Sequence, residues 1–258
     1  MFEARTIVRH AGTVLVGQLA VMAFGIADTV IAGRYDASAL AALSVGSAIY
    51  ISIYVALNGL MQALLPVWSE LRGAGAKAAL GQSVRQAVYL CLGASTLGSL
   101  ALLLPDPWLQ WTGVPEALQA DVKAYLKILA IAVGPSLLFR MYATLNQSLG
   151  MPLWVTGLQI AALAIKIPLS IWFTLGGLGL EAQGVVGCAW ATLLVNTWLM
   201  CMGLYFLRHQ AVYADKFGVL CVPLSQRFLL CQHPTKSLPA HCWQYPRSKA
   251  PYTSNWPS

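Results

Sequence analysis

The sequence predicts an all-α fold, a polytopic membrane bundle of about six transmembrane helices, and three observations lead to this prediction. Hydrophobic residues make up 58% of the chain and charged residues only 10%, whereas about 25% of the residues in soluble domains are charged. Six separate apolar segments each approach the length of about 20 residues with which a helix crosses a bilayer. The connections between them are short and show no long alternating strands, which disfavours a membrane β-barrel.

The expected spans are the apolar segments that lie between polar or helix-breaking residues. We place the helices at about 11–32, 44–68, 86–104, 125–149, 153–175 and 184–207. The first is longer than the apolar core of a signal peptide and has no clean small-residue cleavage site, so we expect it to be retained. Together the helices define a domain at residues 1–215, followed by a tail at residues 216–258.

Turn residues justify the end of each helix in order. The short turn 33–36 follows the first helix, and a glycine-rich basic loop at 71–77 follows the second. Two prolines in 105–107 end the third helix, and we expect a longer acidic loop with Glu116 and Asp121 after it.

The last three helices are bounded in the same way. A Gly-Met-Pro turn at 150–152 separates the fourth helix from the fifth, and glycines at 176–179 open the loop before the sixth. From residue 219 onward the chain contains six prolines and four basic residues but no acidic residue. We therefore expect the tail 216–258 to be disordered.

Basic residues fall on one side of the membrane if the helices alternate in direction. They occur before the first helix, after the second and after the sixth: Arg5, Arg9, Arg72, Lys77, Arg85, Arg208 and Lys216. Because basic residues favour the cytoplasmic side, both termini are expected to be cytoplasmic. The same pattern explains the net charge of +7 without a nucleic-acid partner, since no basic run alternates with aromatic residues.

Three ionisable residues within the expected spans, Asp28, Lys166 and Arg140, are candidates for function, because charges are costly in a bilayer. Asp28 lies near the end of the first helix, where its carboxylate can exchange a proton, bind Na⁺, or simply stay hydrated near the interface. Lys166 lies near the middle of the fifth helix, just before Pro168. We expect Lys166 to face the bundle interior and to pair with Asp28, unless it reaches the interface as a snorkelling side chain.

The other polar residues within the spans have a structural and a functional interpretation. Arg140 can reach the cytoplasmic face or pair with a carboxylate such as Glu70, and we favour a structural role. Uncharged polar residues can join helices through hydrogen bonds or line a polar cavity. The candidates for a cavity wall are Gln18, Asn58, Gln62 and Asn196.

Signatures of enzymes and metal sites are missing from the sequence. No phosphate-binding loop, dinucleotide-binding glycine motif or HExxH motif occurs, so we expect neither an enzyme nor a bound cofactor. The set Cys231, His233, His241 and Cys242 does not have the spacing of a zinc finger, and we expect no metal there.

Several motifs together resemble one transporter family, MATE (multidrug and toxic compound extrusion), and most closely its NorM-like branch. The motifs are DTVIAGR at 28–34, LRGAG at 71–75, KIPLS at 166–170 and GVVGCAWAT at 184–192. The resemblance runs from about residue 5 to residue 215, where the six expected helices are equivalent to one lobe of a twelve-helix transporter.

This resemblance implies antiport of small cationic, often aromatic drugs against protons or Na⁺ across the bacterial inner membrane. Asp28 matches the carboxylate of the N-terminal lobe at which the coupling cation acts. Lys166 and Ser170 match fifth-helix positions that are usually polar and uncharged or acidic, and Thr192 matches a polar position of the sixth helix. We expect these four residues to form the cation-coupling site, and the fixed cation of Lys166 favours protons over Na⁺ as the coupling ion.

The chain departs from the family because it resembles one lobe only. We expect a truncated exporter whose tail resembles an out-of-frame or fragmentary C-terminus, and which could associate with a C-terminal lobe, another copy, or membrane lipid. Two alternatives are a non-functional membrane remnant with the same fold and a flippase for lipid-linked precursors from the same superfamily.

Overall fold

The computed structural model describes residues 2–112, 114–177 and 181–209, so the tail 216–258 and its Cys/His set lie outside the described residues. Within these residues the chain forms eight helices, which confirms the all-α prediction. They are α1 Phe2–Tyr35, α2 Ala37–Gln62, α3 Leu64–Gly73, α4 Lys77–Leu103, α5 Asp106–Thr112, α6 Glu116–Ser148, α7 Pro152–Leu175 and α8 Val185–His209.

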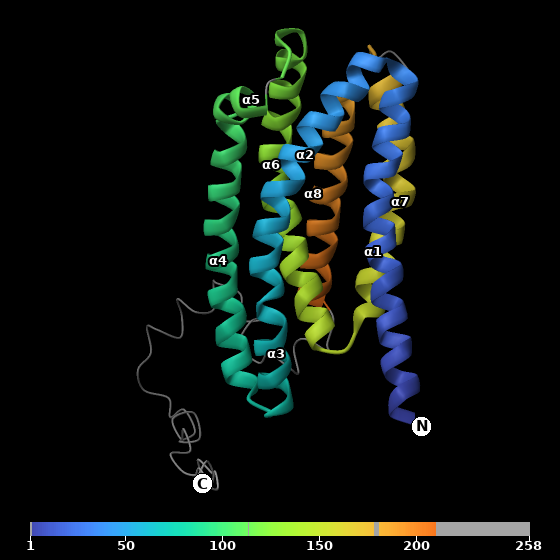
Figure 1. The fold of residues 1–258 in the computed structure, drawn as a ribbon. Helices are drawn as coiled ribbons and strands as arrows, with labels where there is room; N and C mark the ends of the chain where they lie inside the picture. The colour runs from blue at the N-terminus through green and yellow to red at the C-terminus, as the bar shows by residue number, and fades with distance from the viewer. Residues whose placement is uncertain (1, 113, 178–180, 210–258) are drawn as a thin grey trace, which may run out of the picture. The chain divides into compact units, whose positions relative to one another are not determined.

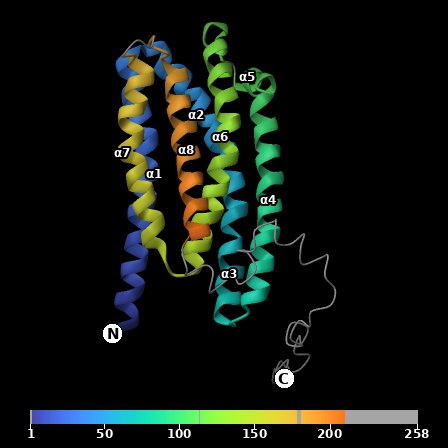
Figure 2. The same ribbon diagram turned by 180° about the vertical axis from the view of Figure 1, so that it is seen from behind.

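The helices provide the six predicted spans. In the described part of the chain, six stretches are long and apolar enough to cross a membrane, and α2 together with α3 makes one of them. Successive spans run in opposite directions, so the start of α1 and the end of α8 lie at the same end of the bundle (Figures 1 and 2). The basic α3–α4 connection lies at this end as well.

Several helices continue beyond the apolar segments that predict them. The expected acidic loop after residue 107 is wrong, because Glu116 begins α6 and Asp121 lies within it, while α5 fills the preceding segment. A carboxylate in the first turn of a helix is favourable beside the unpaired backbone N–H groups there, which accounts for Glu116. Asp106 in turn pairs with Lys123 of α6, with Oδ1 and Nζ 2.6 Å apart.

α6 is the central helix of the bundle. It contacts α2, α3, α4, α7 and α8, whereas α1 packs against α7, and α7 against α8. Most of α6 is buried, while large apolar side chains on the outer helices stay exposed, among them Leu15 on α1 and Leu97 on α4. Exposed apolar faces of this kind suit contact with lipid chains.

A contact at one end of the bundle ties α3 to α6. The guanidinium of Arg72 donates a hydrogen bond from Nη1 to the carbonyl oxygen of Ser148, at a distance of 2.9 Å. Ser148 is the last residue of α6, where carbonyl groups lack partners within the helix and a positive charge is favourable.

Replacing Arg72 with glutamine is therefore expected to lower the free energy of unfolding by about 1 kcal/mol. The measurement is chemical unfolding of the detergent-solubilised chain followed by circular dichroism. The matched control is Arg85→Gln on the exposed side of α4, which should change stability by less than about 0.5 kcal/mol. Equal effects of the two variants would contradict the assigned contact.

Candidate functional site

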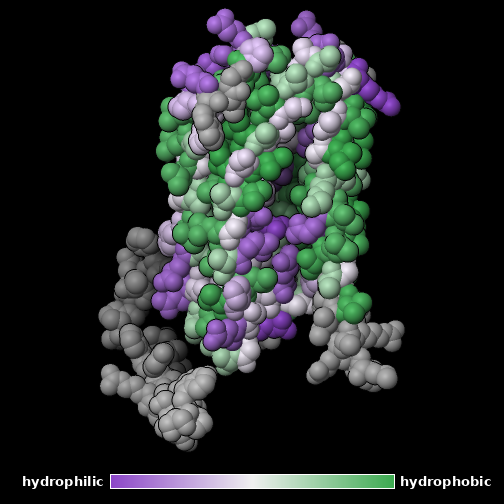
Figure 3. All heavy atoms as spheres, viewed as in Figure 1, coloured by the Kyte–Doolittle hydropathy of each residue, from purple (hydrophilic) through white to green (hydrophobic). Residues whose placement is uncertain are grey.

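A cavity with a volume of about 560 Å³ is formed by residues of α1, α2, α6, α7 and α8. The space-filling view shows a hollow on the face between α1 and α2, where hydrophilic side chains appear among hydrophobic ones (Figure 3). Pockets of about 300–1,000 Å³ with a few polar groups on a mainly apolar wall are typical of sites for small organic molecules.

A buried ion pair lies on the wall of this cavity. Nζ of Lys166 on α7 is 2.8 Å from Oδ2 of Asp28 on α1, and the whole residues are only 2% and 7% exposed. The predicted pairing of Lys166 with Asp28 is thus present. At this degree of burial each charge depends on the other, because an isolated ion in an apolar interior is strongly destabilising.

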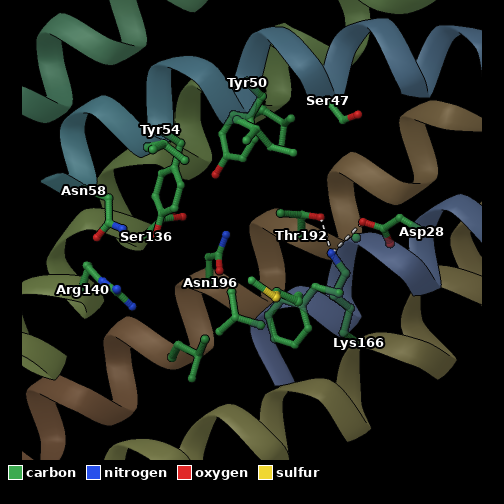
Figure 4. A pocket seen from close by; sticks show the side chains of 18 of the residues that line it. Asp28, Ser47, Tyr50, Tyr54, Asn58, Ser136, Arg140, Lys166, Thr192 and Asn196 are labelled. Atoms are coloured by element: carbon green, nitrogen blue, oxygen red, sulfur yellow. Dashed lines mark hydrogen bonds and ion pairs between the residues drawn. The ribbon is translucent and has the colours of Figure 1, made fainter. Parts of the chain in front are cut away.

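Hydrogen bonds hold both members of the ion pair. Ser170, one turn after Lys166, donates its hydroxyl to Oδ1 of Asp28 at 3.1 Å. Lys166 also donates to Oγ1 of Thr192 on α8 at 2.7 Å (Figure 4). The Thr192 hydroxyl donates onward to the carbonyl oxygen of Cys188 at 2.9 Å, so this hydroxyl acts as both an acceptor and a donor.

The sequence of α7 explains why these side chains meet. Gln159, Lys166 and Ser170 fall at helical spacing and are all buried, which makes a polar stripe on the inner side of this otherwise apolar helix. Phe24 of α1 adds a further contact, with its ring centroid 5.2 Å from Nζ of Lys166. An aromatic face at this distance attracts an ammonium group.

A second polar group lies at the other end of the cavity, where Arg140, Asn58 and Tyr54 lie away from Lys166 (Figure 4). Arg140 is 9% exposed, and its Nε has no hydrogen-bond partner. The alternative in which Arg140 pairs with Glu70 is wrong, because among the described residues ion pairs join only Lys123 to Asp106 and Lys166 to Asp28. The reason is position, since Arg140 faces the cavity whereas Glu70 is exposed on α3.

A model of one protein family matches residues 14–172, which is more than half of the chain, and the description of this family is MatE.

The chain belongs to the MatE family.

Relatives with known names agree with this assignment. The probable multidrug resistance protein NorM of Aromatoleum aromaticum is 35% identical to this MatE chain over 204 residues, which cover 79% of the chain and 44% of the relative. The multidrug resistance protein PmpM of Pseudomonas aeruginosa is 30% identical over 210 residues, covering 81% of the chain and 44% of the relative. The MatE chain therefore spans less than half the length of these relatives, and its resemblance to NorM proteins is confirmed.

Solved structures show the same fold. The crystal structure of the MATE transporter VcmN of Vibrio cholerae in its bent form superposes with a TM-score of 0.73 at 20% identity, covering 88% of the chain and 50% of that transporter. MatE family members are transporters, so this chain is a multi-pass membrane protein of a transporter family rather than an enzyme.

The predicted site residues of this MatE chain do not all lie in one place. Asp28, Lys166 and Thr192 meet at one end of the cavity, and Ser170 supports Asp28 from behind the cavity wall. Gln18, Asn58 and Asn196 line the cavity, whereas Gln62 lies beyond its lining near the end of α2. The assignment of Asp28, Lys166, Ser170 and Thr192 to cation coupling stays a prediction.

Sequence reasoning missed the aromatic part of the cavity. Tyr50 and Tyr54 on α2 stack with ring centroids 5.6 Å apart, and both line the cavity together with Phe24. A signal was available, because residues four positions apart lie on one face of a helix. Tyr50, Tyr54 and Asn58 follow one another at intervals of four on this span, which could have been interpreted as an inward face.

Proposed function

We propose that the chain acts as the N-terminal lobe of an exporter for small aromatic drugs, cationic ones included, which couples export to proton movement at Asp28. The observation that carries the proposal is the buried Lys166–Asp28 ion pair on the wall of a cavity of about 560 Å³. The multidrug resistance names of NorM and PmpM relatives support the drug-like substrate class.

The surroundings of Asp28 favour a proton over Na⁺ as the coupling ion. Both carboxylate oxygens already have partners, since Lys166 contacts Oδ2 and Ser170 contacts Oδ1. A sodium ion at Asp28 would lie within a few ångströms of the Lys166 ammonium, where two like charges repel strongly at low dielectric. A proton instead removes the charge of Asp28 and needs no additional ligand.

Protonation would weaken the contact that holds Lys166 in place. The ionisable groups near Asp28 on the neighbouring helices are Lys166 on α7, Tyr125 on α6 and Cys188 on α8. Neutral Asp28 would leave the ammonium of Lys166 without a counter-charge, which favours rearrangement of α7 relative to α1. This step would link proton binding to a change in the cavity wall.

The placement of basic residues supports an orientation in a bacterial inner membrane with both termini in the cytoplasm. Arg72, Lys77 and Arg85 belong to α3 and α4 near the end of the bundle where α1 starts and α8 ends. Basic residues accumulate on the cytoplasmic side of membrane proteins. A second six-helix lobe would pack beside this one within the same membrane.

Efflux from cells that express this chain tests the proposal. Cells without other exporters should accumulate less ethidium and less of a fluoroquinolone when the chain is present, and a protonophore should abolish the difference. Lys166→Asn should reduce efflux or make it depend on Na⁺, because a neutral ligand replaces the fixed cation. Arg85→Gln, exposed on α4, is the matched control and should leave efflux unchanged.

Quantifying each variant in the membrane separates loss of function from loss of protein. Efflux that is driven by Na⁺ in the unmodified chain, or that keeps both its rate and its ion preference in Lys166→Asn, would overturn the coupling proposal. Complete absence of efflux from a chain present in the membrane would favour the non-functional remnant instead.

A further inference from the structure

We infer that the Arg140 end of the cavity is a binding subsite for the carboxylate group of an aromatic compound. The inference deepens the proposed export function by naming a substrate class, and it rests on that function only for its biological use. Its physical basis is the charge balance of the cavity, the unpaired state of Arg140 and the aromatic wall beside it.

The charged residues that line the cavity do not balance. Within the described lining they are Asp28, Lys166 and Arg140. The first two neutralise each other at 2.8 Å, so the charge of Arg140 is uncompensated. A buried guanidinium without a counter-ion is unfavourable, and an anion that enters the cavity would remove this penalty.

The unpaired donor of Arg140 points to a ligand with oxygen acceptors. Nε of Arg140 has no hydrogen-bond partner, although only 9% of the residue is exposed. Asn58 lies at the same end of the cavity in Figure 4, and its buried Oδ1 has no partner either, but as an acceptor it does not add to a carboxylate site. The planar fork of arginine matches the two oxygens of a carboxylate.

Aromatic side chains lie between Arg140 and the ion pair. Tyr50 and Tyr54 stack at an interplanar angle of 12°, and Tyr54 lies close to Asn58 and Arg140 in Figure 4. A planar aromatic ligand can pack on such rings while its carboxylate reaches the guanidinium. The cavity volume of about 560 Å³ accommodates a ligand of two or three fused rings.

The other end of the cavity offers less to a cationic ligand. The ammonium of Lys166 already contacts Asp28 and lies over the ring of Phe24, which are the contacts that a ligand ammonium would use. A cation must first displace Lys166, whereas a carboxylate at Arg140 displaces no protein group. The charge and contacts therefore favour aromatic carboxylates over purely cationic aromatics.

Calorimetric titration of the purified full chain in detergent tests the subsite directly. The probes are 2-naphthoate, its neutral isostere 2-naphthamide, and 2-naphthyl phosphate. We expect 2-naphthoate to bind the unmodified chain at least about tenfold more tightly than 2-naphthamide, because a hydrogen-bonded charge pair contributes a factor of that order. This comparison needs no variant and stays informative if a substitution prevents folding.

Substitutions then test whether Arg140 causes the preference for 2-naphthoate over 2-naphthamide. Arg140→Gln should remove the advantage of 2-naphthoate over 2-naphthamide, and Arg140→Lys should keep part of it because the charge stays but the fork is lost. Arg85→Gln, outside the cavity lining, is the matched control and should behave as the unmodified chain.

Three results would overturn the inference. They are equal binding of 2-naphthoate and 2-naphthamide by the unmodified chain, an advantage of 2-naphthoate that survives Arg140→Gln, and 2-naphthyl phosphate binding at least tenfold more tightly than 2-naphthoate. The last result would indicate a phosphate ligand such as a lipid headgroup. Because the assay measures binding alone, its outcome is independent of whether cells expressing the chain show efflux.

Discussion

Replacing Asp28 with asparagine is expected to lower the free energy of unfolding of the chain by about 3–5 kcal/mol, because it leaves Lys166 charged and buried without its partner. Lys166 is only 2% exposed, and its remaining contacts are the Thr192 hydroxyl and the ring of Phe24. Neither carries a negative charge. The measurement is chemical unfolding in detergent at neutral pH, and the midpoint of thermal unfolding is a second readout.

A double variant distinguishes loss of the ion pair from a general effect of mutation. Asp28→Asn combined with Lys166→Met should recover most of the lost stability, since an apolar side chain of similar length replaces the orphaned ammonium. Asp36→Asn, at the exposed cap of α2, is the matched control because asparagine caps a helix about as well as aspartate. If Asp28→Asn were no more destabilising than Asp36→Asn, the pair would not carry the proposed energy.

Replacing Gly187 with alanine is expected to destabilise the contact between α7 and α8 by about 1–3 kcal/mol or more. A Cβ atom at this position would lie 2.5 Å from both the carbonyl carbon and the carbonyl oxygen of Phe173, and 2.7 Å from the backbone nitrogen of Thr174. These are backbone atoms, so no side-chain rotation can relieve the clash. The two helices would have to separate, and apolar contacts between them would be lost.

The matched substitution is Gly93→Ala on α4, where an added Cβ meets no atom within 4 Å. Alanine favours a helix over glycine by about 1 kcal/mol, so this variant should be neutral or slightly stabilising. Thermal unfolding of the two purified variants measures the difference. A Gly187→Ala protein as stable as the Gly93→Ala protein would show that α7 and α8 can adjust at this contact.

The sequence was sufficient to predict the spans and the partner of Lys166 for energetic reasons. Crossing a bilayer requires a minimum apolar length, and each of the six spans shows it in the sequence. A lysine in the middle of an apolar helix needs a counter-charge, and Asp28 is the only carboxylate within the six expected spans. Both inferences follow from large free-energy penalties, which exclude most other arrangements of the chain.

Helix ends and the unpaired position of Arg140 could not be predicted because they depend on small energies or on three-dimensional contacts. α6 begins at Glu116, before the apolar segment, since polar residues outside the bilayer form helix at little free-energy cost. Whether Arg140 faces Glu70 or the cavity depends on the rotation of α6 among five neighbouring helices. The stacking of Tyr50 on Tyr54 likewise becomes a cavity wall only when α1, α6 and α8 enclose it.

The contact between Lys166 and Asp28 has a consequence for affinity measurements. A side chain tethered to the same protein acts as a competitor whose effective concentration is millimolar or higher and does not change with dilution. A soluble cation that binds at Asp28 must overcome this competitor. Its apparent affinity is its intrinsic affinity multiplied by the fraction of time for which Lys166 vacates the site. Apparent dissociation constants for cationic ligands should therefore be higher than those that Asp28 would give without its internal competitor.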